Sequence, residues 1–168
     1  MTHIELAATV TNGSLLELIP EFSLPQPKIP DHLIAAYRSA NYRAGTGKDA
    51  ITLRVDQYSE PLSRLLAESG HRCAAFITAC NPFGALENLE ANMKACADLR
   101  DRLERYVAQP DQIIEGMGID SSGAWPPEKS FLVLGLDLET SRTLGREFGQ
   151  NAVVWAGADA IPLLILLR

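Results

Sequence analysis

The sequence predicts one domain of the α/β (α+β) class: a mixed sheet in a ferredoxin-like β-α-β-β-α-β order, preceded by a β-α unit and followed by an extra strand. A chain of 168 residues has the size of one ordinary domain. Its 46% hydrophobic and 21% charged residues match the averages of soluble globular domains. Strand-like and helix-like hydrophobic patterns then alternate along the chain.

The first thirty residues carry a different pattern. Four prolines, at 20, 25, 27 and 30, interrupt scattered apolar residues and prevent a regular helix. We therefore expect an extended, Pro-containing arm over residues 1–30 and a single globular domain over residues 31–168.

A helix and then a β-α unit open the domain. Asp31 is a suitable N-cap for a short helix that ends near Asn41, before Gly45-Thr46-Gly47 breaks the chain. Residues 51–55 alternate apolar and polar side chains, which predicts a strand. Residues 59–70 predict a helix that Ser59 caps and Gly70 ends.

The next segments supply the middle of the sheet. Residues 73–80 form an almost continuous apolar run, typical of a strand that is buried on both faces. From Ala85 to the Gln109-Pro110-Asp111 break, apolar residues recur every three or four positions and predict a long amphipathic helix. Its expected apolar stripe comprises Leu86, Leu89, Met93, Cys96, Leu103 and Val107.

The C-terminal segments complete the predicted order. Residues 112–117 and 131–136 are expected to be strands of a hairpin with a long Gly- and Pro-rich loop at 121–127. A short helix follows from Asp137 and Thr140 to Gly149. Residues 152–155 and 162–167 predict a final pair of strands.

Composition also excludes several classes of protein. The formal charge of -6 and the pI near 5.0 disfavour a nucleic-acid-binding protein, which needs clustered Lys and Arg. Cys73, Cys80 and Cys96 lack zinc or redox spacing, so we expect buried, reduced thiols. No metal or cofactor motif occurs. The N-terminus lacks the pattern of a signal peptide, and Pro162 interrupts the longest apolar run, which favours a cytoplasmic protein with no membrane span.

Several segments resemble, in order, the bacterial family catalogued as domain of unknown function 3293 (DUF3293). The resemblance covers roughly residues 35–167 and implies a single bacterial domain, but it implies no activity, cofactor or partner. The segments that carry it are Ala75-Phe-Ile-Thr-Ala-Cys-Asn-Pro-Phe83, Glu87-Asn88, Glu115-Gly116, Trp125-Pro-Pro-Glu128, Ser130-Phe-Leu-Val-Leu-Gly135 and Arg146-Glu-Phe-Gly-Gln-Asn-Ala-Val-Val154.

Two asparagines are candidate ligand-binding residues. Asn81 follows a buried strand and precedes a helix, so its amide and the free N–H groups of the first helical turn suit a carboxylate or phosphate. The alternative is that Asn81 only caps the turn before Pro82. Asn88 lies one turn into the same predicted helix, and its alternative role is an exposed or backbone-bonded amide.

Two carboxylates flank the predicted hairpin loop. Glu115 and Glu128 would face one another across paired strands and form a pair for acid-base or cation chemistry. The alternative is two solvated charges. Within the loop, Trp125 offers either a stacking surface for a flat ligand or a ring that packs the loop onto the sheet.

A third group surrounds the end of the last predicted helix. Arg146 with the amides of Gln150 and Asn151 suits an anionic or amide-bearing ligand. Alternatively, Arg146 only complements the helix dipole at that C-terminus.

Our leading hypothesis is a small-ligand-binding domain, or an enzyme, for an anionic or flat, nucleotide-like ligand. The expected cleft residues are Asn81, Glu115, Trp125, Glu128, Arg146, Gln150 and Asn151. A second hypothesis is an acidic interaction module, such as an inhibitor, an immunity protein or a regulatory subunit, that covers a basic protein partner and has no enclosed pocket. A third is homodimerisation through the strand at residues 161–167.

Overall fold

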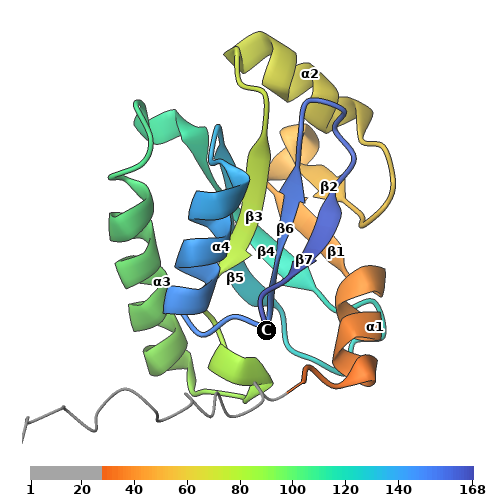
Figure 1. Ribbon diagram of the computed structural model, residues 1–168, viewed down its shortest axis with the longest axis vertical. Helices are drawn as coiled ribbons and strands as arrows, with labels where there is room; N and C mark the ends of the chain where they lie inside the picture. Colours follow the sequence, from red (N-terminus) through yellow and green to blue (C-terminus); the bar gives the residue numbers. More distant parts are fainter. Residues whose placement is uncertain (1–27) are drawn as a thin grey trace, which may run out of the picture.

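The computed structural model describes residues 28–168 as one curled, seven-stranded sheet with four α-helices (Figure 1). The arm predicted for residues 1–30 therefore lies almost wholly outside the described residues. The strands are β1 (Asn41–Ala44), β2 (Ile51–Leu53), β3 (Ala74–Thr78), β4 (Ile113–Ile119), β5 (Glu128–Leu134), β6 (Ala152–Ala156) and β7 (Leu163–Leu166). The helices are α1 (Asp31–Ser39), α2 (Glu60–Ser69), α3 (Leu89–Leu103) and α4 (Leu138–Glu147).

The sheet has the strand order β2-β1-β4-β5-β3-β6-β7. The α/β class is confirmed, but the prediction of a mixed sheet is wrong because all six described pairings are antiparallel. The reason lies in the three helical crossovers. The crossover through α3 joins β3 to β4, with β5 between them, and the crossover through α4 joins β5 to β6, with β3 between them. The crossover through α2 joins β2 to β3, with β1, β4 and β5 between them. Each crossover skips at least one strand, so parallel strands never become neighbours.

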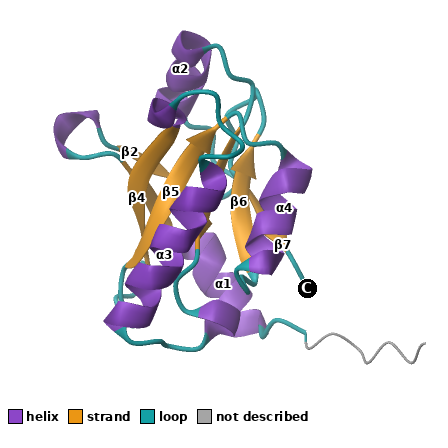
Figure 2. Cartoon of the chain, turned by 90° about the vertical axis from the view of Figure 1, so that its left-hand side faces the viewer, coloured by secondary structure: helices purple, strands orange, loops and turns teal. Residues whose placement is uncertain are grey.

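The two faces of the sheet bury separate cores. On one face, α3 lies over β5 and α4 lies over β3 and β6 (Figures 1 and 2), and Leu99 and Leu144 pack among Ile77, Phe131 and Val133. The other face is the inside of the curl. Its core comprises Ala44, Leu53, Val55, Leu62, Leu66, Ala74, Phe76, Leu132, Leu134, Val154, Ala156 and Ala160. Because β3 contributes to both cores, its continuous apolar run is explained.

The predicted caps of α2 are confirmed. Ser59 accepts a hydrogen bond from the backbone N–H of Leu62 at the start of α2, and Gly70 ends that helix with a left-handed φ of 74°. The predicted N-cap of α1 is wrong: Asp31 is the first helical residue, Pro30 is the N-cap, and no side chain caps the helix. Helix α4 begins where predicted, with Asp137 accepting the N–H of Thr140, and the β4–β5 hairpin is also confirmed. No helix within residues 28–168 has the length and apolar character needed to cross a bilayer.

Strand β1 was not predicted. Helix α1 ends at Ser39, and Asn41–Ala44 pairs with β2 on one side and with β4 on the other. Four residues are too few to reveal a period of two, so a strand this short leaves no pattern in the sequence.

The long helix predicted from Ala85 is also corrected. Helix α3 begins only at Leu89, after a turn of 3-10 helix at Pro82–Gly84, and ends at Leu103. Its C-terminal half buries Cys96, Leu99 and Leu103 against the sheet. The expected N-terminal part of the stripe instead faces solvent: Leu86, Leu89 and Met93 are 61%, 76% and 62% exposed. Hydrophobic periodicity identifies the apolar face of a helix, but it does not show how much of that face packs against other residues.

Two glycines of β4 provide a matched test of packing inside the curl. A Cβ on Gly116 would lie 2.4 Å from the backbone oxygen of Arg43 in β1, whereas a Cβ on Gly118 would meet its nearest atom, Ser130 Oγ, at an ordinary 3.7 Å. We expect Gly116→Ala to lower the free energy of unfolding by about 1–3 kcal/mol, because β1 must move. Gly118→Ala should be neutral or slightly stabilising. Urea denaturation measures both, and equal effects would contradict this account.

Candidate functional site

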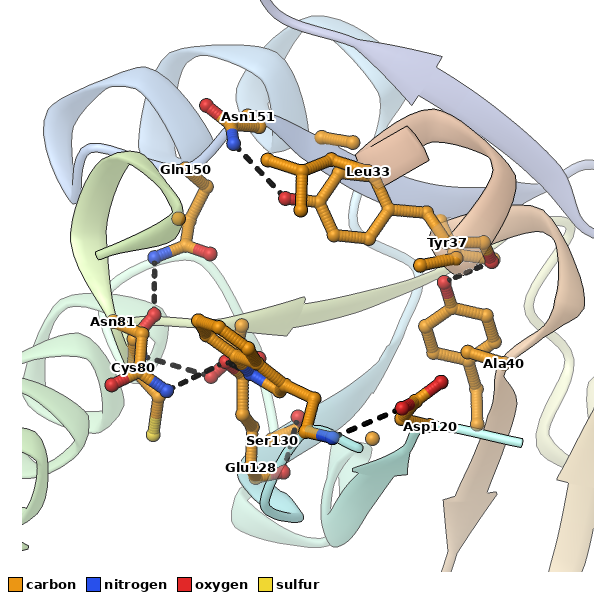
Figure 3. Close-up of a pocket in the computed structure, with 18 of the residues that line it drawn as sticks. Leu33, Tyr37, Ala40, Cys80, Asn81, Asp120, Glu128, Ser130, Gln150 and Asn151 are labelled. Atoms are coloured by element: carbon orange, nitrogen blue, oxygen red, sulfur yellow. Dashed lines mark hydrogen bonds between the residues drawn. The ribbon is translucent and has the colours of Figure 1, made fainter. Parts of the chain in front are cut away.

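A cavity of about 350 Å³ opens on the inner face of the curled sheet, at the end where α1 lies (Figures 1 and 3). Helix α1 provides Leu33 and Tyr37 on one side, and the turn after β3 provides Cys80 and Asn81 on the opposite side. The remaining lining residues belong to the strands between them and to the loops at 120–125 and 150–151. They include Ala40, Tyr42, Phe76, Thr78, Gly118, Asp120, Trp125, Glu128, Ser130, Gln150, Asn151, Val154 and Leu164.

Five of the eight predicted site residues meet at this cavity: Asn81, Trp125, Glu128, Gln150 and Asn151. The other three lie elsewhere. Asn88 caps α3 by accepting the backbone N–H of Ala91, which is its alternative role. Arg146 is exposed on α4, and its Nε donates to the backbone oxygen of Leu167 at 3.2 Å.

The third residue, Glu115, lies on the opposite face of the sheet from the cavity. In the hairpin Glu115 faces Phe131, whereas Glu128 faces Gly118, so the expected carboxylate pair is not formed. Three residues separate 115 from 118, and an odd offset along a strand moves a side chain to the other face. Glu115 instead lies 3.5 Å from both Arg100 and Lys129.

Glu128 is the carboxylate at the centre of the cavity wall. Its Oε1 accepts the side-chain amide of Asn81 at 2.7 Å and the indole N–H of Trp125 at 2.8 Å. Trp125 is fixed in turn by its backbone N–H, which donates to Asp120 Oδ2 at 3.0 Å. Oε2 of Glu128 makes no hydrogen bond with any residue in the described range 28–168 and is left as a free acceptor.

Asn81 holds this carboxylate from a buried and fully bonded position. Its backbone adopts a left-handed conformation, φ 49° and ψ 61°, which Asn tolerates better than most residues. Its N–H donates to Asn92 Oδ1, and its Oδ1 accepts from Glu87 N and from Asn92 Nδ2, each at 2.9 Å. Asn81 therefore does more than cap the turn before Pro82: it ties the end of β3 to the start of α3 and to Glu128.

The wall opposite Glu128 combines the predicted Asn151 with two tyrosines, Tyr37 and Tyr42, that sequence reasoning missed. The Asn151 amide donates to the Tyr37 hydroxyl at 2.9 Å, and the Tyr42 hydroxyl donates to the Tyr37 backbone oxygen at 2.6 Å. Asn151 Oδ1 accepts Arg168 Nε at 2.7 Å. The only signal was the spacing of Leu33 and Tyr37, four residues apart on one face of a short helix.

In the cavity wall, neutral hydrogen-bond donors surround acidic side chains. Burial raises the pKa of Tyr42 far above its usual value of 10, and burial likewise raises the pKa of Tyr37, so both phenols stay protonated. None of the described lining residues is Lys or Arg. Within residues 28–168, no group of three His, Cys, Asp or Glu side chains is arranged to hold a metal ion. The cavity can therefore accept hydrogen bonds from the donor groups of a ligand and enclose the apolar part of that ligand.

Residues 77–153 match the model of the family described as Protein of unknown function (DUF3293). The match runs from within β3 to within β6, and it confirms the resemblance over that part of the chain. It includes Asn81, Trp125, Glu128, Gln150 and Asn151 but not the α1 and β1 side of the cavity. No curated protein and no solved structure gives a significant match to this chain.

The buried phenol of Tyr42 predicts a pH dependence of stability. Because the folded-state pKa is raised above its ordinary value of 10.0, stability is complete below that value and falls as pH rises further, where the unfolded chain gains by ionising. We expect the free energy of unfolding to fall more steeply above about pH 10 in the wild type than in Tyr42→Phe. Tyr58→Phe, at a residue 60% exposed, is the control and should keep the wild-type slope. Parallel slopes for the wild type and Tyr42→Phe in urea denaturation would contradict the assignment.

Proposed function

We propose that this chain, whose residues 77–153 match a family without an assigned activity, is a small-molecule-binding domain. Its ligand is a compact, flat, largely apolar molecule with an N–H or cationic donor that bonds to Glu128. The proposal rests on the Glu128 carboxylate, which lies in the wall of a cavity of about 350 Å³. Two neutral donors bond to one of its two oxygens. Cavities of this size, apolar with a few oriented polar groups, are typical of small-molecule sites.

Charge favours a neutral or cationic ligand. Glu128 and Asp120 are acidic members of the wall, and the described lining residues include neither Lys nor Arg. The expectation of an anionic ligand rested on Arg146. The side chain of Arg146 instead bonds to the backbone oxygen of Leu167. An unpaired anion beside Glu128 would be repelled, so of the two expected ligand types we retain the flat one and no longer propose the anionic one.

Aromatic rings support a flat ligand. The cavity wall contains Trp125, Tyr37, Tyr42 and Phe76, and Trp125 is fixed by hydrogen bonds from its indole N–H and from its backbone N–H. Stacking on a pre-positioned ring contributes about 1–3 kcal/mol per base in proteins that bind single-stranded nucleic acid. A nucleobase-like heterocycle with an exocyclic amine satisfies both requirements.

We propose binding and assign no reaction. A two-carboxylate mechanism would need a partner for Glu128, and Glu115 lies on the other face of the sheet. The cavity also supports ligand binding over the acidic interaction module, since that hypothesis expects no enclosed pocket. The cytoplasmic location remains part of the proposal.

We also propose that β3, α3, β4, β5, α4 and β6 form a ferredoxin-like unit to which β1, β2 and β7 are added. The neighbour relations β4-β5-β3-β6 support this reading. In such a unit the helices cover one face, which leaves the other face free for a ligand.

A thermal-shift screen tests the proposed function, with nucleobases, nucleosides and aromatic amines set against carboxylates and phosphates of similar size. A donor-bearing flat ligand at 100 times its Kd should stabilise the native state by about 2.7 kcal/mol. We expect Glu128→Gln to lose most of this effect, because an amide replaces the free carboxylate oxygen.

Glu115→Gln is the matched control, since it removes the same charge from the opposite face and should leave the shift unchanged. A shift produced only by anionic ligands, or one that survives in Glu128→Gln, would overturn the proposed site. Trp155→Phe adds an independent measurement, because Trp125 is then the only tryptophan left and its fluorescence should change on binding.

A further inference from the structure

Two of the three cysteines lie together beside the cavity. Cys80 follows β3 and lines the cavity, and Cys96 lies on the buried face of α3 behind it. Their Sγ atoms are 3.3 Å apart, close enough for one thiol to donate a hydrogen bond to the other. The residues are 16 positions apart in the sequence, so spacing alone does not reveal the pair.

The surroundings of the pair are polar on one side only. Both sulfurs also contact the backbone oxygen of Lys129 at 3.6 Å, which holds them on the same side of β5. Cys80 and Cys96 are only 5% and 2% exposed. Cys80 is the member of the pair that lines the cavity, and Cys96 lies on the buried face of α3.

We propose that Cys80 and Cys96 form an oxidation site, at which a small hydroperoxide that enters the cavity converts the two thiols to an intrachain disulfide. A disulfide has an S–S distance of about 2.05 Å, so the sulfurs need to approach by only about 1.3 Å, which side-chain rotation can supply. The inference concerns a chemistry separate from ligand binding and does not depend on Glu128.

The electrostatics support a reactive pair. The hydrogen bond from the Cys80 thiol lowers the pKa of Cys96 to about 7, against the effect of burial, with smaller contributions from the Ala79 N–H and the Lys129 ammonium. The same hydrogen bond raises the pKa of Cys80. Of the two sulfurs, Cys96 is therefore the one that holds the thiolate more readily, with Cys80 as its hydrogen-bond donor.

The proposed chemistry balances with hydrogen peroxide as the oxidant. The Cys80 thiol passes its proton to the Cys96 thiolate along their hydrogen bond as the Cys80 sulfur attacks one peroxide oxygen. An S–O bond forms, the O–O bond breaks, and hydroxide leaves as water with the proton already released by the pair. Cys96 sulfur then attacks the sulfur of Cys80. The S–S bond forms, the S–O bond breaks, and the second hydroxide leaves with the remaining thiol proton. Two thiols are oxidised by two electrons, and one peroxide is reduced to two waters.

Intact-mass spectrometry of the full reduced chain, treated with hydrogen peroxide and then with a maleimide, tests the proposal. We expect a product that has lost about 2 Da and takes up one maleimide, on Cys73, with a peptide map that links Cys80 to Cys96. Its formation should be at least about tenfold faster than oxidation of Cys73, which has no neighbouring thiol among the described residues.

Three variants distinguish this product from side reactions. Cys80→Ala and Cys96→Ala should each abolish the product that lacks two hydrogens, whereas Cys73→Ala should form it at the wild-type rate. Circular dichroism checks that each variant is folded, and the wild-type experiment stands even if one variant is not. Sulfinic acid on Cys80 without a disulfide, or a disulfide that forms only in urea concentrations that unfold the chain, would overturn the proposal.

Discussion

The side-chain amide of Asn81 connects three parts of the chain: the end of β3, the segment that leads into α3 and the start of β5. Its backbone continues β3, its oxygen bonds to the segment that starts α3, and its nitrogen holds Glu128 at the start of β5. Asn81 is buried, and a buried amide that loses its partners costs about 1–3 kcal/mol, so this network constrains all three segments at once. The position of the carboxylate, and with it the chemistry of the cavity, depends on this one side chain.

The elements that the sequence predicted well are those with strong local signals. The apolar run of β3 and the caps Ser59 and Gly70 each reflect a physical requirement that a few neighbouring residues satisfy alone. Strand β1 and the antiparallel arrangement of the whole sheet have no such signal. They are decided by which strands become neighbours, a question of tertiary packing.

The site was predictable to a similar degree. Asn81, Trp125 and Glu128 were predicted as site residues because polar and aromatic residues at the ends of strands often face a ligand. Glu115 was predicted for the same reason, yet it lies an odd number of positions along β4 from Gly118, the residue that faces Glu128, and therefore on the opposite face of the sheet. Tyr37 and Tyr42 were missed because nothing in the residues near them indicates that Tyr37 meets Asn151 across the cavity or that Tyr42 bonds to the backbone of Tyr37.

The contact between Tyr37 and Asn151 joins residues 114 positions apart, and the pairing of β1 with β4 joins Asn41 to Ile119. Contacts of such long range form late and slowly in folding, because the chain must close large loops before any of them stabilises it. The cavity therefore has no counterpart in a fragment or in a nascent chain that still lacks β6. An assay of ligand occupancy would thus report completion of the whole fold during synthesis, and a single break anywhere between α1 and β6 would separate the two walls.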